Sequence, residues 1–150
     1  MTEEVLVSIK GLQFEGDIDS DKIETITKGS YYKKNGGHYI LYDEATEGFQ
    51  QTTKSMIHIK GRELNITKKG LINVHMIFEE NKKNMTNYST PFGDILIGID
   101  AKKVDFTETE DRMIVDVEYA LEVNYEHFAD CNIKMDIRPK EQGRLLRDGY

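Results

Sequence analysis

Apolar and polar residues alternate along most of this 150-residue chain, with the period of two that turns one face of a β-strand toward a core. In the strictest run, residues 112–123, one face carries six apolar or aromatic residues: Met113, Val115, Val117, Tyr119, Leu121 and Val123. Polar and acidic residues dominate the other face. No segment prefers the helical period of 3.6 residues. The pattern therefore predicts an all-β chain.

Turn signals separate these runs, and the clearest of them is Asn35-Gly36-Gly37, because Asn and Gly accept the positive φ of hairpin turns. A two-residue turn at Asn35-Gly36 pairs Tyr32 with Tyr39 on one face and Tyr31 with Ile40 on the other. Both faces of this hairpin are then apolar or aromatic. Its outer face needs a cover, and the C-terminal tail, a second subunit and another partner all stay open as candidates.

Short connections between about ten strand-like runs predict an up-and-down order. Closing such a meander into a barrel removes the unpaired edges that template aggregation. We therefore predict a single antiparallel up-and-down β-barrel of about 8–10 strands over residues 1–138. A C-terminal tail without a partner pattern follows over residues 139–150. A two-sheet β-sandwich is the alternative.

Composition limits the partners and the compartment. With 27 acidic and 20 basic residues the formal charge is −7, which disfavours nucleic acid, because neutralising phosphates needs concentrated Lys and Arg. The single cysteine, Cys131, cannot form an internal disulfide, and the acidic start MTEEVLVSIKG lacks the basic region of a signal peptide. No apolar run approaches the ~20 residues that span a bilayer. We expect a cytoplasmic protein with no nucleic-acid or membrane partner.

Three stretches carry a family resemblance: the hairpin YYKKNGGHYILYDE, the run MIFEENKKNMTNYSTPFGDILIGI with its Thr90-Pro91-Phe92-Gly93 turn, and the strand AKKVDF. In this order they resemble the YwiB-like bacterial family, a domain of unknown function, from about Ile9 to Ile137. The resemblance implies a small calycin-type barrel similar to lipocalins and fatty-acid-binding proteins. It implies no established activity.

The strand faces assigned to the interior are apolar throughout, and no Arg or Lys is placed among them. A core filled by its own side chains is therefore one interpretation, since small barrels are commonly packed solid. The other is a pocket for a small apolar or amphipathic ligand, anchored by a tyrosine. The candidate ligand-binding residues are aromatic residues of the hairpin, a turn and one strand: Tyr31, Tyr32, Tyr39, Tyr42, Phe92 and Tyr119.

No catalytic or metal-binding constellation is recognisable in the sequence, so we predict no catalytic residue, no cofactor and no metal. His58 and His75 fall on outward faces and are interpreted as a surface pair that lacks further ligands. Cys131 alternates with core residues and is expected to behave as a small hydrophobe. The competing class is a barrel enzyme that uses the hairpin tyrosines with His38 as acid–base groups, which requires these side chains to converge on one concavity.

Apolar residues also interrupt the outward faces: Leu6, Met56, Leu71, Ile77, Phe92, Leu96 and Ile114. A contiguous apolar patch on a monomer marks an interaction site. A protein-interaction module with a solid core, forming a homodimer through a sheet face, is therefore a further alternative.

Overall fold

The computed structural model describes residues 3–11 and 24–140. They form ten strands of one antiparallel sheet: β1 (Glu4–Lys10), β2 (Glu24–Lys34), β3 (Gly37–Glu44), β4 (Thr53–Lys60), β5 (Glu63–Gly70), β6 (Val74–Glu79), β7 (Lys82–Thr90), β8 (Gly93–Glu108), β9 (Met113–Val123) and β10 (Glu126–Pro139). The sheet order is β6-β5-β4-β3-β2-β1-β10-β9-β8-β7. The structure thus confirms the all-β class and the up-and-down order, and the sheet is nearly closed into a barrel.

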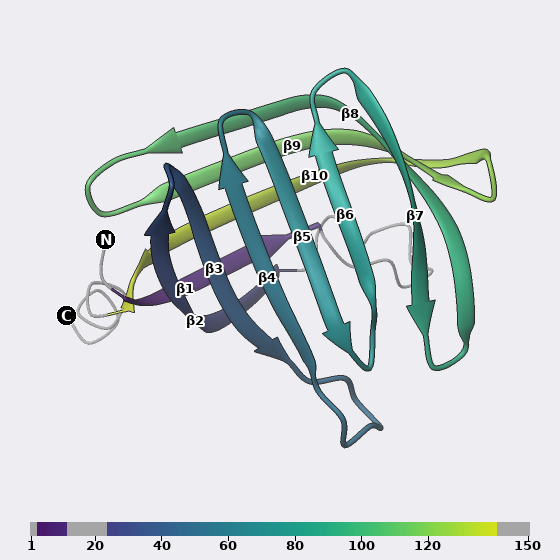
Figure 1. The fold of residues 1–150 in the computed structure, drawn as a ribbon, viewed down its shortest axis with the longest axis horizontal. Helices are drawn as coiled ribbons and strands as arrows, with labels where there is room; N and C mark the ends of the chain where they lie inside the picture. The colour runs from purple at the N-terminus through teal and green to yellow at the C-terminus, as the bar shows by residue number, and fades with distance from the viewer. Residues whose placement is uncertain (1–2, 12–23, 141–150) are drawn as a thin grey trace.

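The barrel is flattened into two layers whose strands cross steeply, with β3–β6 in front of β8–β10 in Figure 1. Strand β2 serves both layers, since it pairs with β1 from Glu24 to Ser30 and with β3 from Ser30 to Lys34. Gly29 lies at this corner, where an added Cβ would come within 3.0 Å of the Leu41 carbonyl oxygen. A small residue therefore allows the close approach that lets β2 turn from one layer to the other.

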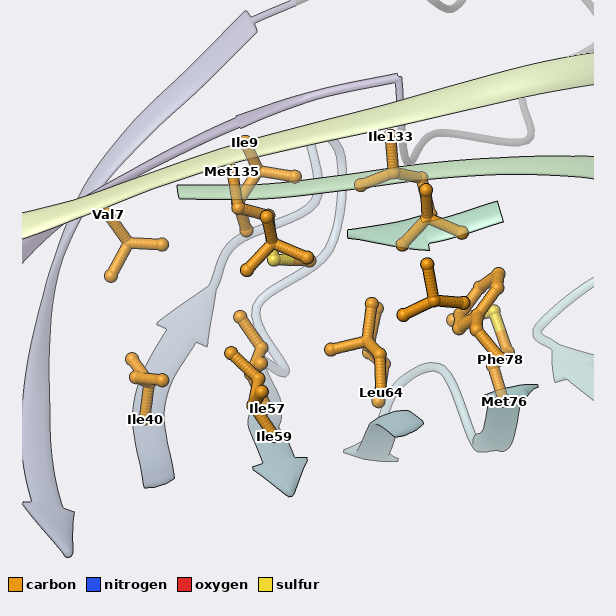
Figure 2. Close-up of a cluster of buried hydrophobic side chains, with 14 of the residues drawn as sticks. Val7, Ile9, Ile40, Ile57, Ile59, Leu64, Met76, Phe78, Ile133 and Met135 are labelled. Atoms are coloured by element: carbon orange, nitrogen blue, oxygen red, sulfur yellow. The ribbon is translucent and has the colours of Figure 1, made fainter. Parts of the chain in front are cut away.

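The core fills the space between the layers. Figure 2 shows Ile40, Ile57, Leu64, Met76 and Phe78 from β3–β6 pointing toward Val7, Ile9, Ile133 and Met135 from β1 and β10. Each of these side chains is at most 5% exposed. Burying one large aliphatic side chain contributes about 1.5–3 kcal/mol, so this central layer is the main source of stability.

The predicted hairpin turn is confirmed. Asn35 and Gly36 have φ values of 53° and 78°, which are the two positive angles of a type I′ turn. Tyr32 pairs with Tyr39 and Tyr31 with Ile40 in the β2–β3 ladder. Local turn chemistry therefore sets the register of this hairpin.

Strands β6 and β7 follow each other in the chain but form no ladder between the described residues, apart from one bridge between Asn73 and Ser89. The turn that joins them is attached to β8 instead, because the Asn81 N–H donates to the Ala101 carbonyl and the Val104 N–H donates to the Glu80 carboxylate. We call the interval between β6 and β7 the seam. Figure 1 shows the two strands diverging there.

Strand β10 ends at Pro139, and residues 141–150 of the predicted tail lie outside the described residues. The described part of the chain contains no helix that is both long enough and apolar enough to cross a membrane.

Candidate functional site

Polar side chains turn inward near the margins of the apolar core, which corrects the prediction of a wholly apolar lining without lysine. Lys68 shares the inner face of β5 with Leu64 and Ile66, and His38 and Ser55 are buried as well. The period of two already places Lys68 on the face of Leu64 and Ile66 in the sequence. These inward polar groups form two clusters.

The first, hereafter the hairpin cluster, consists of Tyr31, His38 and Glu108. The Tyr31 hydroxyl lies 2.7 Å from His38 Nδ1, and His38 Nε2 lies 3.6 Å from a carboxylate oxygen of Glu108. The Phe106 ring packs on the imidazole with a centroid separation of 5.5 Å. Because a carboxylate faces Nε2, we assign the imidazole proton to Nε2, so that Tyr31 donates to Nδ1.

Burial favours the uncharged forms of the two ring side chains of the hairpin cluster, His38 and Tyr31. Burial lowers the pKa of His38; the Glu108 carboxylate opposes this, and Lys33 adds to it. Burial, helped by Glu108, raises the pKa of the Tyr31 hydroxyl. A neutral imidazole and a neutral phenol are therefore expected at neutral pH.

The second, hereafter the loop-end cluster, consists of Tyr42, Glu44, Ser55 and Lys68. The sheet register places Tyr42, Ser55 and Lys68 opposite one another on β3, β4 and β5. Ser55 Oγ and Lys68 Nζ both donate to the same oxygen of Glu44, each at 2.6 Å. Burial, with a contribution from Glu44, raises the pKa of the Tyr42 hydroxyl, which is therefore a neutral hydrogen-bonding group.

The loop-end cluster lies next to connecting segments that contact each other. We call residues 45–52, 71–73 and 91–92 the loop end, which is at the lower side of Figure 1. The Ile72 N–H donates to the Thr53 hydroxyl, and residues 73 and 89 form the bridge described above. The rings of Phe49 and Phe92 meet edge to face with centroids 6.0 Å apart, and Phe92 is 88% exposed. An exposed aromatic pair thus stands at the same end as the buried polar cluster.

The six candidate aromatic residues do not converge on one site. Tyr31 belongs to the hairpin cluster, Tyr42 to the loop-end cluster, and Phe92 to the loop end. Tyr32 and Tyr39 lie on the outer face, where Tyr39 stacks between Tyr32, at 4.8 Å, and His58, at 4.2 Å. Sequence reasoning missed Glu44, Phe49, Ser55 and Lys68.

Tyr119 lies alone in the inner wall of β9. It is 2% exposed, its ring packs edge to face on Phe78 at 5.1 Å, and its hydroxyl has no hydrogen-bond partner among the described residues. Burial raises its pKa well above the usual range, and the Cys131 thiol across the ladder adds to the effect. The hydroxyl is therefore a neutral donor inside the barrel, and its polar neighbour across the ladder is the weakly hydrogen-bonding thiol of Cys131.

The predicted surface pair of histidines does not form, because β5 separates β4, which carries His58, from β6, which carries His75. His75 bonds Asn65 at 3.0 Å instead, and His58 stacks on Tyr39. Within the described ranges no group of three or more His, Cys, Asp or Glu side chains could hold a metal ion.

A shallow, open depression of about 330 Å³ lies on β8–β10, lined by Lys102, Glu118, Tyr119, Asp130, Cys131 and Asn132. Strand alternation turns Glu118 and Asp130 outward, opposite to Tyr119, so this depression combines outward charged side chains with residues of the inner wall. We assign no function to it.

Comparison with known proteins supports the family resemblance. The family described as Domain of unknown function (DUF1934) matches residues 7–135. The crystal structure of ywiB protein from Bacillus subtilis is similar, with a TM-score of 0.76 and 18% identity over 91% of this chain and 92% of that chain. At this identity the likeness shows a shared fold, and comparison with curated proteins finds no match. Because the family match covers most of the sequence, the chain belongs to the DUF1934 family, a YwiB-like domain of unknown function.

Proposed function

We propose that this protein binds a small amphipathic molecule at the loop end and does not act as an enzyme there. The observation that carries the proposal is the juxtaposition of a buried polar cluster and an exposed aromatic pair at one end of the barrel. Small-molecule sites combine apolar walls with a few placed polar groups, and this end offers both.

The two parts of the site fit the two parts of such a ligand. The exposed rings of Phe49 and Phe92 offer apolar surface to a hydrocarbon or aromatic portion. The hydroxyls of Tyr42 and Ser55 and the ammonium of Lys68 offer hydrogen bonds to a polar head. Calycin-like ligand binding, which the family resemblance implies, is part of this proposal.

The experiment is titration with an environment-sensitive amphipathic fluorophore, combined with native mass spectrometry of freshly purified protein. Replacing both rings, Phe49→Ser with Phe92→Ser, should weaken fluorophore binding by about 10-fold. A 10-fold change is about 1.4 kcal/mol, which is the free energy lost when apolar contact equivalent to one or two buried methylenes disappears. Ile114→Ser is the matched control, since Ile114 is 41% exposed on the outer face of β9. Equal affinity of the double variant and the wild type would contradict the proposal.

A second candidate function is acid–base catalysis at the hairpin cluster, supported by the direct contacts that join Tyr31, His38 and Glu108. A carboxylate, an imidazole and a hydroxyl in series resemble the arrangement that activates a hydroxyl nucleophile. Hydrolysis of an activated aryl ester tests it. His38→Gln should abolish turnover, His75→Gln should leave it unchanged, and wild-type protein without activity above background removes this candidate.

Compartment and assembly are extensions of the same proposal. A chain with a single cysteine suits the reducing cytoplasm. Tyr32 and Leu41 are each 41% exposed on the outer face of the β2–β3 hairpin, and they support a homodimer through this sheet face. Light scattering that shows a monomer at high protein concentration would remove the dimer.

A further inference from the structure

We propose that the ligand of the loop end carries a carboxylate head group, and that Glu44 occupies the place of this head when no ligand is bound. The inference rests on the proposed function and names the class of ligand that the same site selects. It is carried by the contacts of Glu44 with Ser55 and Lys68 and by the unequal burial of the two charges.

The cation of the site is fixed inside the barrel. Lys68 lies within β5, opposite Ser55 on one neighbouring strand and Val74 on the other, and its side chain is 11% exposed. A charge removed from water to this extent needs a partner of opposite sign. Any molecule that occupies the cluster must therefore satisfy the ammonium.

The anion, in contrast, is placed where it can leave. Glu44 is the last residue of β3, it precedes the connection 45–52, and its side chain is 33% exposed. One of its oxygens accepts from both Ser55 and Lys68 at 2.6 Å. Rotating this carboxylate into water while a ligand carboxylate takes over both hydrogen bonds leaves the charge of the site unchanged, so the exchange avoids burying an unpaired ion.

Other head groups fit less well. A cationic head beside Lys68 adds like-charge repulsion in a poorly solvated place. A neutral head cannot replace the charge of Glu44 and must bind beside an intact Lys68–Glu44 pair. Removing the charge of Glu44 should therefore change the affinity for a ligand with a carboxylate head and leave the affinity for the matching neutral ligand nearly unchanged.

The test compares a fluorescent long-chain carboxylic acid with its methyl ester. In Glu44→Gln the acid should bind at least about 5-fold more tightly than in wild type, because its internal competitor is gone, while the ester changes by less than about 2-fold. In Lys68→Met the acid should bind about 10-fold more weakly. Asp43→Asn and Lys69→Met are matched controls, since each removes the same charge from an exposed neighbouring position, and both should retain wild-type affinities.

Ser55→Ala is a third variant that keeps both charges and removes one donor to the head, so it tests the inference if an ion-pair variant fails to fold. It should weaken the acid by about 3-fold or more and leave the ester unchanged. If neither probe binds any variant, the proposed function fails together with the inference. If both probes bind equally and neither Glu44→Gln nor Ser55→Ala separates them, the inference alone is overturned.

Discussion

At the scale of single residues, the buried hydroxyl of Tyr119 is a local defect in an otherwise apolar wall. Among the described residues its oxygen has no oxygen or nitrogen partner, and it lies beside the Phe78 ring with only the weakly hydrogen-bonding Cys131 thiol across the ladder. An unsatisfied buried donor costs about 1–3 kcal/mol, because it has lost its water and gained nothing in return. Packing of the ring and satisfaction of the hydroxyl are therefore separable contributions at this position.

Tyr119→Phe should accordingly stabilise the protein by about 1 kcal/mol, since it removes the unsatisfied group and keeps the ring. For a chain of this size that corresponds to a rise in Tm of about 2–4 °C. Tyr42→Phe is the control, because the Tyr42 hydroxyl interacts with Ser55 and Glu44 and its loss should lower the Tm. A lower Tm for Tyr119→Phe would show that the hydroxyl has a partner in solution.

His38 should make stability depend on pH. Burial lowers its pKa in the folded protein, against the opposing Glu108 carboxylate and together with Lys33 and His58. The unfolded chain, with an ordinary histidine pKa of about 6.5, then binds more protons than the folded chain. The contribution of neutral His38 to the free energy of unfolding is therefore complete above pH 6.5. It is lost as the pH falls from 6.5 through the lowered pKa of His38 in the folded protein.

The measurement is urea unfolding between pH 8 and pH 5. His38→Gln should flatten the loss of unfolding free energy on the acid side, by at most ~1.4 kcal/mol per pH unit. His75→Gln keeps His38 and should follow the wild type, because His75 is exposed and bonded to Asn65 on the outer face. Parallel curves for wild type and His38→Gln are the outcome that contradicts the prediction.

At the scale of elements, the loop end depends on a glycine at the end of β5. Gly70 has φ 131°, and an added Cβ would collide with the carbonyl oxygen of Thr52, which precedes β4. Gly48 in the connection 45–52 also has a positive φ, 88°, but an added Cβ meets nothing within 4 Å. Alanine at either position would be strained by the positive φ, but only at Gly70 would its Cβ also collide with the Thr52 carbonyl oxygen.

Gly70→Ala should therefore destabilise the protein by about 2–4 kcal/mol, and Gly48→Ala by only about 1–2 kcal/mol. Chemical unfolding measures both. Gly70→Ala should also weaken binding at the loop end, because displacing Thr52 moves the neighbouring Thr53 hydroxyl that holds Ile72. Equal destabilisation by the two substitutions would show that the Thr52 backbone yields without cost.

The elements that the sequence predicts well are those set by local chemistry. The Asn35-Gly36 turn determines the pairing of Tyr32 with Tyr39, and the alternation over Met113–Val123 determines which face of β9 is buried. Both signals act between residues that are close in the chain, so no knowledge of distant contacts is needed.

The candidate site was less predictable, for two physical reasons. The alternation of Leu64, Ile66 and Lys68 places the lysine inside, but its partner Glu44 is 24 residues away and is identified only by the sheet register. Likewise, the contact of Phe49 with Phe92 joins turns that are far apart in sequence. Residue type and periodicity give the direction of a side chain, and only the closed barrel gives its neighbours.

At the scale of the whole molecule, closure is complete between β1 and β10 and incomplete at the seam. The Asn73–Ser89 bridge closes one end of the seam with hydrogen bonds of 3.0 and 2.9 Å, and the Asn84 side-chain amide donates to the Ile77 carbonyl within it. Because the turn at residues 80–81 is hydrogen-bonded to β8, β7 pairs with β8 along its length and diverges from β6. Among the ten described strands one interval therefore remains, between β6 and β7, in which two facing strand edges lack a ladder.

This arrangement predicts an alternating pattern of amide hydrogen exchange along β7. The N–H and C=O groups of Ser89 both bond Asn73 across the seam. Backbone N–H groups alternate sides along a strand, so those of Met85 and Asn87 also point to the seam, while those of Thr86 and Tyr88 point to β8. Met85 and Asn87 should exchange about tenfold or more faster than Thr86 and Tyr88. Along β9, which has a partner on each side, neighbouring amides such as those of Val117 and Glu118 should be protected alike, and this strand is the internal control. Uniform protection along β7 would mean that the seam forms a ladder in solution and that the barrel is fully closed.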